Sequence, residues 1–396
     1  MKTFLMKVGF LRWFFVVITG LIALLILIGC NSQQPSQNDP PTEPTEQVKQ
    51  VVDEAFLAKA KEVVEAATSP STEWNGPTNG PQAQPDKRIV YVSADQHNGG
   101  IAGVSEGVKE AAEAIGWKFE LIDATAQGVE HRQAFEQALA LNPDGIVIGG
   151  IDVFELLLEV ESAHKQGVAV VGWHVAPDPG PTEGLSLFTN ITTPSNDVAE
   201  IAAYYAIAQS NGTAGVVIFT DTRFQIAVAK SNAMADVIRQ CQSCELFTVE
   251  DVPLNQTQAL MPQVINTLLE QYGEKWTYTL GINDLYFDDA IITLETAEIP
   301  PTGRLESLSA GDGSVSAYDR IRSQKYQLGT VPEPLLLHGW QLVDELNRAF
   351  AGEEPSNYIS PVHLVTPDNI NFDGGPDNHY DPDNGYRDQY RAIWNK

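Results

Sequence analysis

The chain contains 396 residues, of which 43% are hydrophobic, so it can bury a sizeable core. Its 52 acidic residues outnumber its 24 lysine and arginine residues, and the formal net charge is −28 at pH 7. Such a surface repels phosphate backbones, and the sequence has no run of basic residues that could form an opposing patch. We therefore expect no nucleic-acid partner.

Residues 1–29 have the three parts of an export signal. Basic residues precede an apolar run, and a small residue, Gly29, stands directly before Cys30. The order Leu-Ile-Gly-Cys resembles the lipobox of bacterial lipoproteins, which implies cleavage before Cys30, acylation of this cysteine and attachment to a lipid bilayer. The alternative is a plain transmembrane anchor, because an apolar run of this length can span a membrane. Both interpretations place the folded part in the bacterial cell envelope, facing the periplasm or the exterior.

The segment 30–86 is predicted to be a spacer with one short helix. Residues 31–46 are rich in proline, glutamine, serine and asparagine and have too few apolar side chains to form a core. Helical spacing of apolar residues predicts an amphipathic helix within 47–67. Proline and glycine return in 69–86, and the compact body is expected to begin near Lys87.

From Lys87 onward, short valine- and isoleucine-rich runs alternate with helical patterns. Strands are predicted at 88–94, 118–124, 145–150, 169–173, 214–220, 246–252, 277–283, 305–310 and 326–331. Helices are predicted near 101–115, 128–141, 153–166, 194–210, 224–239, 257–272, 285–297 and 314–323. Continuous apolar strands separated by helices indicate parallel sheets covered on both faces. With right-handed crossovers this α/β pattern gives a doubly wound sheet, and the series is long enough for two.

Cys241 and Cys244 form a C-x-x-C pair, which suits a local disulfide, a redox centre or half of a zinc site. A zinc site needs a second pair of ligands, and the seven histidines offer none at close spacing. A redox centre normally opens a helix after a strand, whereas this pair stands just before a predicted strand. We therefore expect a structural disulfide, and we expect no bound metal and no cofactor.

The glycine-rich segment 98–103 lies between a predicted strand and a helix, and Asp123 ends the next strand about 20 residues later, as in a dinucleotide-binding fingerprint. The first glycine that this fingerprint requires is, however, replaced by Asn98. An oxidoreductase is therefore disfavoured, and the glycines are predicted to form a tight turn.

In doubly wound sheets, ligands bind beyond the carboxyl ends of the strands, so the residues at these ends are candidate ligand contacts. They combine hydrogen-bonding groups, which can hold hydroxyls, with aromatic rings, which can cover an apolar face. The candidates chosen on this ground are Gln96, Asn98, Asp152, Trp173, Asp221 and Phe224.

Three segments resemble the periplasmic sugar-binding proteins of the ribose- and galactose-binding type, which are the substrate receptors of ABC importers. They are TYTLGINDLYFDDAIITLETAEI, LESLSAGDGSVSAYDRIRSQKYQLGTVPEP and LLLHGWQLVDELNRAFAGEEP, and the resemblance extends over about residues 87–366. It implies a type I periplasmic binding protein and no enzyme activity. Residues 87–193 with 334–364 would form lobe one, and 194–333 with 365–396 would form lobe two and a C-terminal tail, joined by a three-segment hinge.

The resemblance also implies particular ligand contacts. Asn283, Asp284, Asp312 and Glu333 match binding positions of the family. Lys230, His174 and His97 stand where the ribose binders have an arginine, an aspartate and an asparagine. The aromatic pair of the family's first turn is replaced by Asn-Gly-Gly at 98–100, so a stacking ring would have to come from Trp173, Phe224 or Tyr286.

The expected ligand is a sugar or an amino sugar, because the candidate carboxylates Asp221, Asp284, Asp312 and Glu333 outnumber the cationic candidates. The expected partner is a membrane permease, to which a monomeric, lipid-anchored receptor delivers its ligand. The alternative is a ligand sensor for chemotaxis or for a sensor kinase, which would use the same site.

Overall fold

The computed structural model describes residues 52–396. The predicted signal peptide, the lipobox cysteine Cys30 and the first part of the spacer, up to residue 51, lie outside these residues. Within 52–396, no helix is both long and apolar enough to cross a bilayer.

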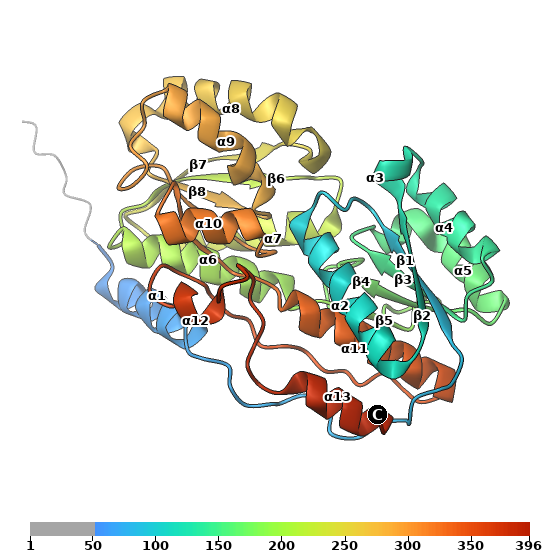
Figure 1. The fold of residues 1–396 in the computed structure, drawn as a ribbon. Helices are drawn as coiled ribbons and strands as arrows, with labels where there is room; N and C mark the ends of the chain where they lie inside the picture. Colours follow the sequence, from blue (N-terminus) through green and yellow to red (C-terminus); the bar gives the residue numbers. More distant parts are fainter. Residues whose placement is uncertain (1–51) are drawn as a thin grey trace, which may run out of the picture. The chain divides into compact units, whose positions relative to one another are not determined.

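Lobe one contains a five-stranded sheet in the order β2-β1-β3-β4-β5, with every strand parallel to its neighbours. Its strands are β1 (Arg88–Ser93), β2 (Lys118–Asp123), β3 (Gly145–Gly149), β4 (Ala169–Trp173) and β5 (Thr189–Ile191). Its helices are α2 (Gly99–Ile115), α3 (Ala124–Gln127), α4 (His131–Ala140), α5 (Leu157–Lys165) and α11 (Leu335–Ala351), with a 3₁₀ turn at Val153–Leu156. Helices α2 and α11 cover one face of the sheet, and α4 and α5 cover the other (Figure 1).

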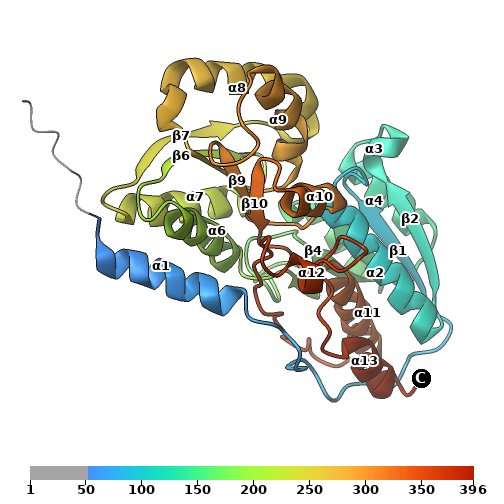
Figure 2. The same cartoon turned by 60° about the vertical axis from the view of Figure 1, so that its left-hand side comes forward.

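Lobe two repeats this arrangement with the strand order β7-β6-β8-β9-β10. Its strands are β6 (Gly215–Thr220), β7 (Glu245–Asp251), β8 (Tyr278–Gly281), β9 (Glu306–Ser309) and β10 (Gln327–Thr330). Its helices are α6 (Ser195–Gln209), α7 (Gln225–Gln240), α8 (Thr257–Tyr272), α9 (Leu285–Thr296) and α10 (Val315–Ser323), with 3₁₀ turns at Leu254–Gln256 and Gly273–Lys275. Helices α8 and α9 lie on one face of this sheet, with α6 and α7 on the other (Figures 1 and 2).

The predicted fold class, two doubly wound parallel sheets, is confirmed. The central strands consist almost entirely of buried residues; β3 and β6 are buried throughout their lengths. Such strands require helices on both faces, and the periodicity predicted most of these helices, though not α11. The sequence analysis missed β5, because its three residues are too few to form a recognisable apolar run.

Three segments of the chain cross between the lobes. The first follows β5 and contains Thr193, and the second follows β10 and contains Glu333. The third returns after α11 to Val365, which pairs in an isolated antiparallel bridge with Thr330 at the end of β10. The side-chain hydroxyl of Thr193 donates to Oε1 of Glu333 at 2.6 Å, so two of the crossing segments are bonded to each other.

The segment before the compact body is more ordered than the predicted spacer. Helix α1 (Glu54–Ala67) begins at its N-cap Asp53 and packs along α6 of lobe two, burying Leu57 and Ala60 (Figure 2). The following proline- and glycine-rich stretch lies on lobe one, where the backbone oxygen of Gln84 accepts a 2.7 Å hydrogen bond from Trp117.

The C-terminal tail, expected in lobe two, is shared between the lobes. Ile370 and Tyr380 join a small apolar cluster with Tyr318 of lobe two. Ile370 is the first residue of α12 (Ile370–Asp373), and α13 (Tyr386–Trp394) follows Tyr380 and packs on lobe one beside α11 (Figure 1). The indole of Trp394 stacks on that of Trp340 at 5.4 Å between centroids. Burial of these aromatic surfaces holds the end of the chain on lobe one.

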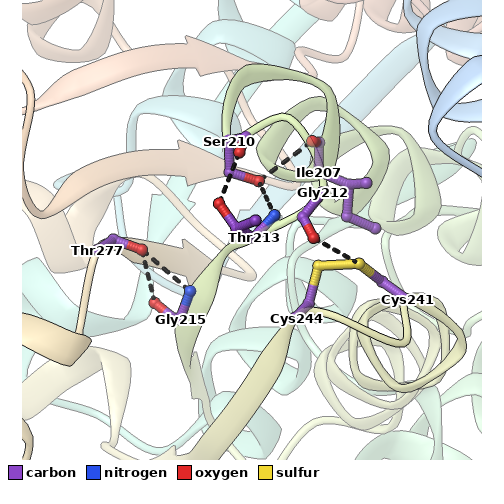
Figure 3. Close-up of a disulfide and its surroundings, with 8 residues drawn as sticks. All are labelled: Ile207, Ser210, Gly212, Thr213, Gly215, Cys241, Cys244 and Thr277. Carbon is purple, nitrogen blue, oxygen red and sulfur yellow. Dashed lines mark hydrogen bonds between the residues drawn. A yellow bond between two sulfur atoms is a disulfide. The ribbon is translucent and has the colours of Figure 1, made fainter. Parts of the chain in front are cut away.

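Cys241 and Cys244 are joined by a disulfide, with a Cα–Cα distance of 5.3 Å (Figure 3). Cys241 ends α7, and Cys244 stands directly before β7. The Sγ atom of Cys241 lies 3.5 Å from the backbone oxygen of Gly212, next to the loop that enters β6. The disulfide therefore fixes the connection between a helix and an edge strand, on a segment that contributes nothing to the cavity described below.

Candidate functional site

A cavity of about 170 Å³ lies between the lobes, at the carboxyl ends of both sheets. From lobe one it is lined by the polar residues Asp95, Asn98, Thr125, His131 and His174. From lobe two it is lined by the polar residues Arg223, Lys230, Asn255, Asn283 and Asp312. Apolar and aromatic side chains, among them Ile101, Trp173, Phe224 and Leu285, complete the wall. The combination of apolar surface with a few convergent polar groups is typical of a small-molecule site.

Lys230 and Asp312 form the charged centre of the lobe-two wall. Lys230 projects from α7, its side chain is only 4% exposed, and its Nζ lies 4.0 Å from Oδ1 of Asp312. The other carboxylate oxygen of Asp312 accepts a 2.7 Å hydrogen bond from the amide of Asn283. The ammonium group makes no hydrogen bond with any residue that the structure describes, so its N–H donors remain available to a ligand in the cavity.

Asp284 stands next to Asn283 in the sequence but serves the fold. Its carboxylate accepts hydrogen bonds from the backbone amides of Gly313 and Ser314, from the side-chain amide of Gln327 and from the hydroxyl of Thr330. Burial raises the pKa of Asp284 to about 6, although the nearby Arg320 and these donors oppose the rise. Asp284 thus fixes the turn that carries Asp312, without lining the cavity.

The lobe-one wall is built from turns and rings. Asn98 is the N-cap of α2, and its side-chain oxygen accepts hydrogen bonds from the amides of Gly100 and Ile101. His174 follows β4 in a left-handed conformation (φ 54°), and its ring stacks on that of Trp173 at 3.7 Å between centroids. The Nδ1 atom of His174 lies 3.9 Å from Oδ1 of Asp312, so the two walls face each other closely.

Glu333 lies behind His174, in the hinge. Its carboxylate accepts hydrogen bonds from the hydroxyl and the amide of Thr193, and Oε1 lies 3.2 Å from Nε2 of His174. Burial alone would raise the pKa of Glu333, but its interactions, chiefly with His174 and also with Lys230, outweigh burial and hold the pKa well below its usual value. The carboxylate is therefore ionised, and it orients His174 from behind.

The next histidine in this chain of contacts is neutral. The indole Nε1 of Trp173 donates to Nδ1 of His338 at 3.1 Å, so the ring proton must be on Nε2, which faces the hydroxyl of Ser360 at 2.7 Å. Burial lowers the pKa of His338 to about 4. The neutral ring anchors Trp173, which lines the cavity.

Seven residues proposed from the sequence line the cavity together: Asn98, Trp173, His174, Phe224, Lys230, Asn283 and Asp312. Six other candidates do not line it: Gln96, His97, Asp152, Asp221, Asp284 and Glu333. Tyr286, considered for stacking, is buried in the lobe-two core, where its hydroxyl donates to the backbone oxygen of Val252.

The remaining displaced candidates bond to other parts of the structure, and Asp152 does so across the cleft, because Gln225 belongs to lobe two. Gln96 bonds to the hydroxyls of Ser93 and Ser105, whereas the side chain of His97 is 81% exposed and contacts Asp95. Asp152 accepts from the amides of Phe154 and Gln225.

Asp221 accepts hydrogen bonds from Nε and Nη2 of the Arg223 guanidinium group, at 2.9 and 2.6 Å. Of the four carboxylates that suggested a cationic ligand, only Asp312 lines the cavity. The wall also carries Asp95, Arg223 and Lys230, so acidic and basic groups are balanced there.

The sequence analysis missed several lining residues that follow the strands next to β1 and β6. Thr125 and His131 follow β2, and Leu254 and Asn255 follow β7. The strand-end rule applies to these loops too, because β2 and β7 are the direct neighbours of β1 and β6, the strands beside which the strand order reverses. Arg223 lies between the candidates Asp221 and Phe224, and its cationic side chain was a sufficient signal for a ligand contact.

Two α/β lobes of the same topology, with a ligand-sized cavity between the carboxyl ends of their sheets, define a two-lobed binding protein. The family model described as a periplasmic binding protein domain matches residues 89–354, and the chain belongs to this family. The members are binding proteins and not enzymes, and the family implies a location outside the cytoplasm. No curated protein matches the sequence.

Solved structures share the fold at low sequence identity. A galactofuranose binding protein matches with a TM-score of 0.62 and 15% identity, over 78% of this chain and 99% of its own. A glucose-galactose binding protein from Geobacillus stearothermophilus also has a TM-score of 0.62 at 15% identity, over 72% of this chain and 99% of its own. A structure described as a XylFII–LytSN complex matches with a TM-score of 0.59 and 14% identity, over 72% of this chain and 99% of the matched chain.

Proposed function

We propose that this protein is the lipid-anchored substrate receptor of an ABC importer and that it captures a neutral sugar or a similar polyol between its lobes. The observation that carries the proposal is the cavity in which Lys230 and Asp312 face His174 across the cleft. The family membership and the sugar-binding titles of the structural neighbours support it.

The groups on the cavity wall suit a hydroxylated ligand. The ammonium group of Lys230 donates and the carboxylate of Asp312 accepts; since the two atoms lie 4.0 Å apart, a sugar hydroxyl beside them can bond to both. Phe224 and Trp173 offer aromatic surface to the C–H face of a ring. Because acidic and basic side chains are balanced on the wall, the proposed ligand carries no net charge.

Delivery to a permease would use the usual logic of a two-lobed receptor. A ligand that contacts both lobes stabilises the closed form, which then docks on its membrane partner. Acylation of Cys30 would keep the receptor close to that membrane. This part of the proposal rests on the sequence features of 1–30 and on the family.

A ligand sensor is the second candidate, favoured by one observation. A structural neighbour was solved in complex with a second protein, as its description XylFII–LytSN states. A receptor of this kind would use the same cavity and present its closed form to another membrane protein.

The test is calorimetry of the purified protein against neutral sugars, amino sugars and sugar acids, together with small-angle scattering. Native mass spectrometry of the protein as purified would first identify any ligand that it retains. We expect tight binding of a neutral sugar and a smaller radius of gyration on binding. Exclusive binding of an amino sugar or a sugar acid would contradict the proposed ligand class, and binding of no sugar would contradict the proposed function.

Asp312→Ala provides the largest expected effect, because it removes the acceptor at the centre of the wall. Affinity should fall by roughly 100-fold or more, since the change also leaves Lys230 without its buried counterion. Asp289→Ala on α9 is the matched control: this carboxylate lies outside the cavity and takes part in none of the hydrogen bonds described for residues 52–396. An Asp312→Ala variant that binds as tightly as the wild type would refute the site.

A further inference from the structure

The two lobes touch at the first turn of α2. A Cβ atom placed on Gly100, in lobe one, would lie 2.4 Å from Oδ2 and 2.5 Å from Cβ of Asp312, in lobe two. A Cβ on Gly99 would lie 2.8 Å from Cβ of Ser314, the residue that caps α10. These approaches are closer than any side chain permits, so the backbone of α2 lies directly against the turn that carries Asp312.

Rotation of the Asp312 side chain could not relieve a methyl group at position 100. The contact includes Cβ of Asp312, whose position is fixed by the backbone, and that backbone is held by the hydrogen bonds to Asp284. Apolar carbon atoms pack at about 3.5 Å or more, so the lobes would have to separate by roughly 1 Å at this point.

We infer that Gly100 is a positioning residue for lobe closure: the absence of its side chain lets the Asp312 carboxylate reach the first turn of α2, which sets the closed form that holds the ligand. This inference rests on the proposed function, because it concerns the closure of the same site. The electrostatics favour the contact, since the amino end of a helix carries partial positive charge and attracts a carboxylate. The Asp312 carboxylate would then contact the first turn of α2 and Asn283, and it would also face the space in front of Lys230.

The variant Gly100→Ala distinguishes a role of Gly100 in lobe closure from a role in the stability of the fold alone. Within a helix, alanine is more favourable than glycine, so a purely structural position would leave the ligand-free protein equally stable or slightly more stable, with unchanged affinity. If Gly100 permits closure, the melting temperature of the ligand-free protein should hold or rise, whereas sugar affinity should fall on the order of 10- to 100-fold. Glu113→Ala, on an exposed position of the same helix, is the control and should change neither quantity.

Closure can be followed without relying on affinity. Leu158 on lobe one and Ile292 on lobe two are 74% and 72% exposed, so cysteines introduced there can carry a pair of fluorescent dyes. Single-molecule energy transfer then reports the distance between the lobes, with and without the neutral sugar that binds the wild type best. We expect the wild type to populate a short-distance state that Gly100→Ala does not reach.

The double variant Gly100→Ala with Asp312→Gly tests the mechanism, because it removes the atoms that the new methyl group would meet. It should recover the short-distance state in the absence of ligand, although it lacks the carboxylate needed for binding. Identical distance distributions in the wild type and Gly100→Ala, or no recovery in the double variant, would overturn the inference. Failure of every sugar to bind the wild type would instead overturn the proposed function, and the ligand-free distances would still decide the role of Gly100.

Discussion

The two walls of the cleft are made in different ways. On lobe two, polar side chains at the strand ends hold one another: Asp284 bonds to the turn of Asp312, and Asp312 bonds to Asn283. On lobe one, the wall consists of a capped helix start and stacked rings, and its ionised support, Glu333, comes from the hinge. A carboxylate at a strand end can therefore belong to the scaffold of a site as readily as to its ligand contacts.

This difference predicts that the strand-end carboxylates of the two lobes contribute unequally to stability. Asp284→Ala should lower the free energy of unfolding by about 2–4 kcal/mol, because it leaves several buried donors without an acceptor. Asp152→Ala, on lobe one, removes the cap of a short 3₁₀ turn and should cost about 1 kcal/mol. Urea denaturation of both variants measures the contrast, and equal losses would show that the two walls are supported alike.

Lobe one has a buried carboxylate of its own, Glu345 on α11, which should make stability depend on pH. Burial raises its pKa from the usual 4.5 to about 7, although hydrogen bonds from Ser356 oppose the rise. The native state therefore holds this proton more tightly than the unfolded chain does. The stabilisation is fully present below about pH 4.5 and is lost as the pH rises through 7.

Glu345→Gln removes this titration. Between pH 4.5 and 8, the stability of the wild type relative to the variant should fall by about 1–3 kcal/mol. Chemical denaturation at the two pH values provides the measurement, and the difference between the proteins cancels the other titrating groups. A difference that does not change with pH would place the titration of Glu345 near its usual range.

The smallest effect is expected at His97, which the sequence placed among the ligand contacts. Its side chain is 81% exposed and does not line the cavity, so His97→Ala should change sugar affinity by less than about twofold. Asn98→Ala is the informative neighbour, because it removes the N-cap of α2 and should lower both stability and affinity. A large loss of affinity in His97→Ala would mean that the first turn of lobe one rearranges on binding.

The sequence predicted the fold well because continuous apolar strands leave few alternatives. It located the edge of each sheet at which the cavity lies, but it could not say which way a side chain points there. Asp284 and Asp312 illustrate the limit: both follow strands of lobe two, and only the packing around Gln327 and Thr330 turns the first away from the cavity. Glu333 likewise depends on Thr193, which is 140 residues distant in the chain.

The C-terminal helix was missed for a different reason. Tyr386, Tyr390 and Trp394 recur at four-residue intervals, which is a helical pattern, and all three are buried. The acidic and proline-containing stretch before them concealed this signal. Their partners, Trp340 and Asp344, lie on α11, so the pattern gains meaning only once that helix is known to be part of lobe one.

The segments before and after the two-lobed core limit how far the lobes can move apart. Helix α1 is fixed to lobe two and the stretch that begins near Trp74 is fixed to lobe one, while the tail makes the same passage between Tyr380 and Tyr386. Each of these additional connections between the lobes has a limited length. The roughly six residues after Ala67 can span at most about 20 Å when fully extended. In the proposed ligand cycle, a wide separation of the lobes would therefore have to detach α1 or α13, and the rate of ligand exchange would depend on the stability of elements that do not line the cavity.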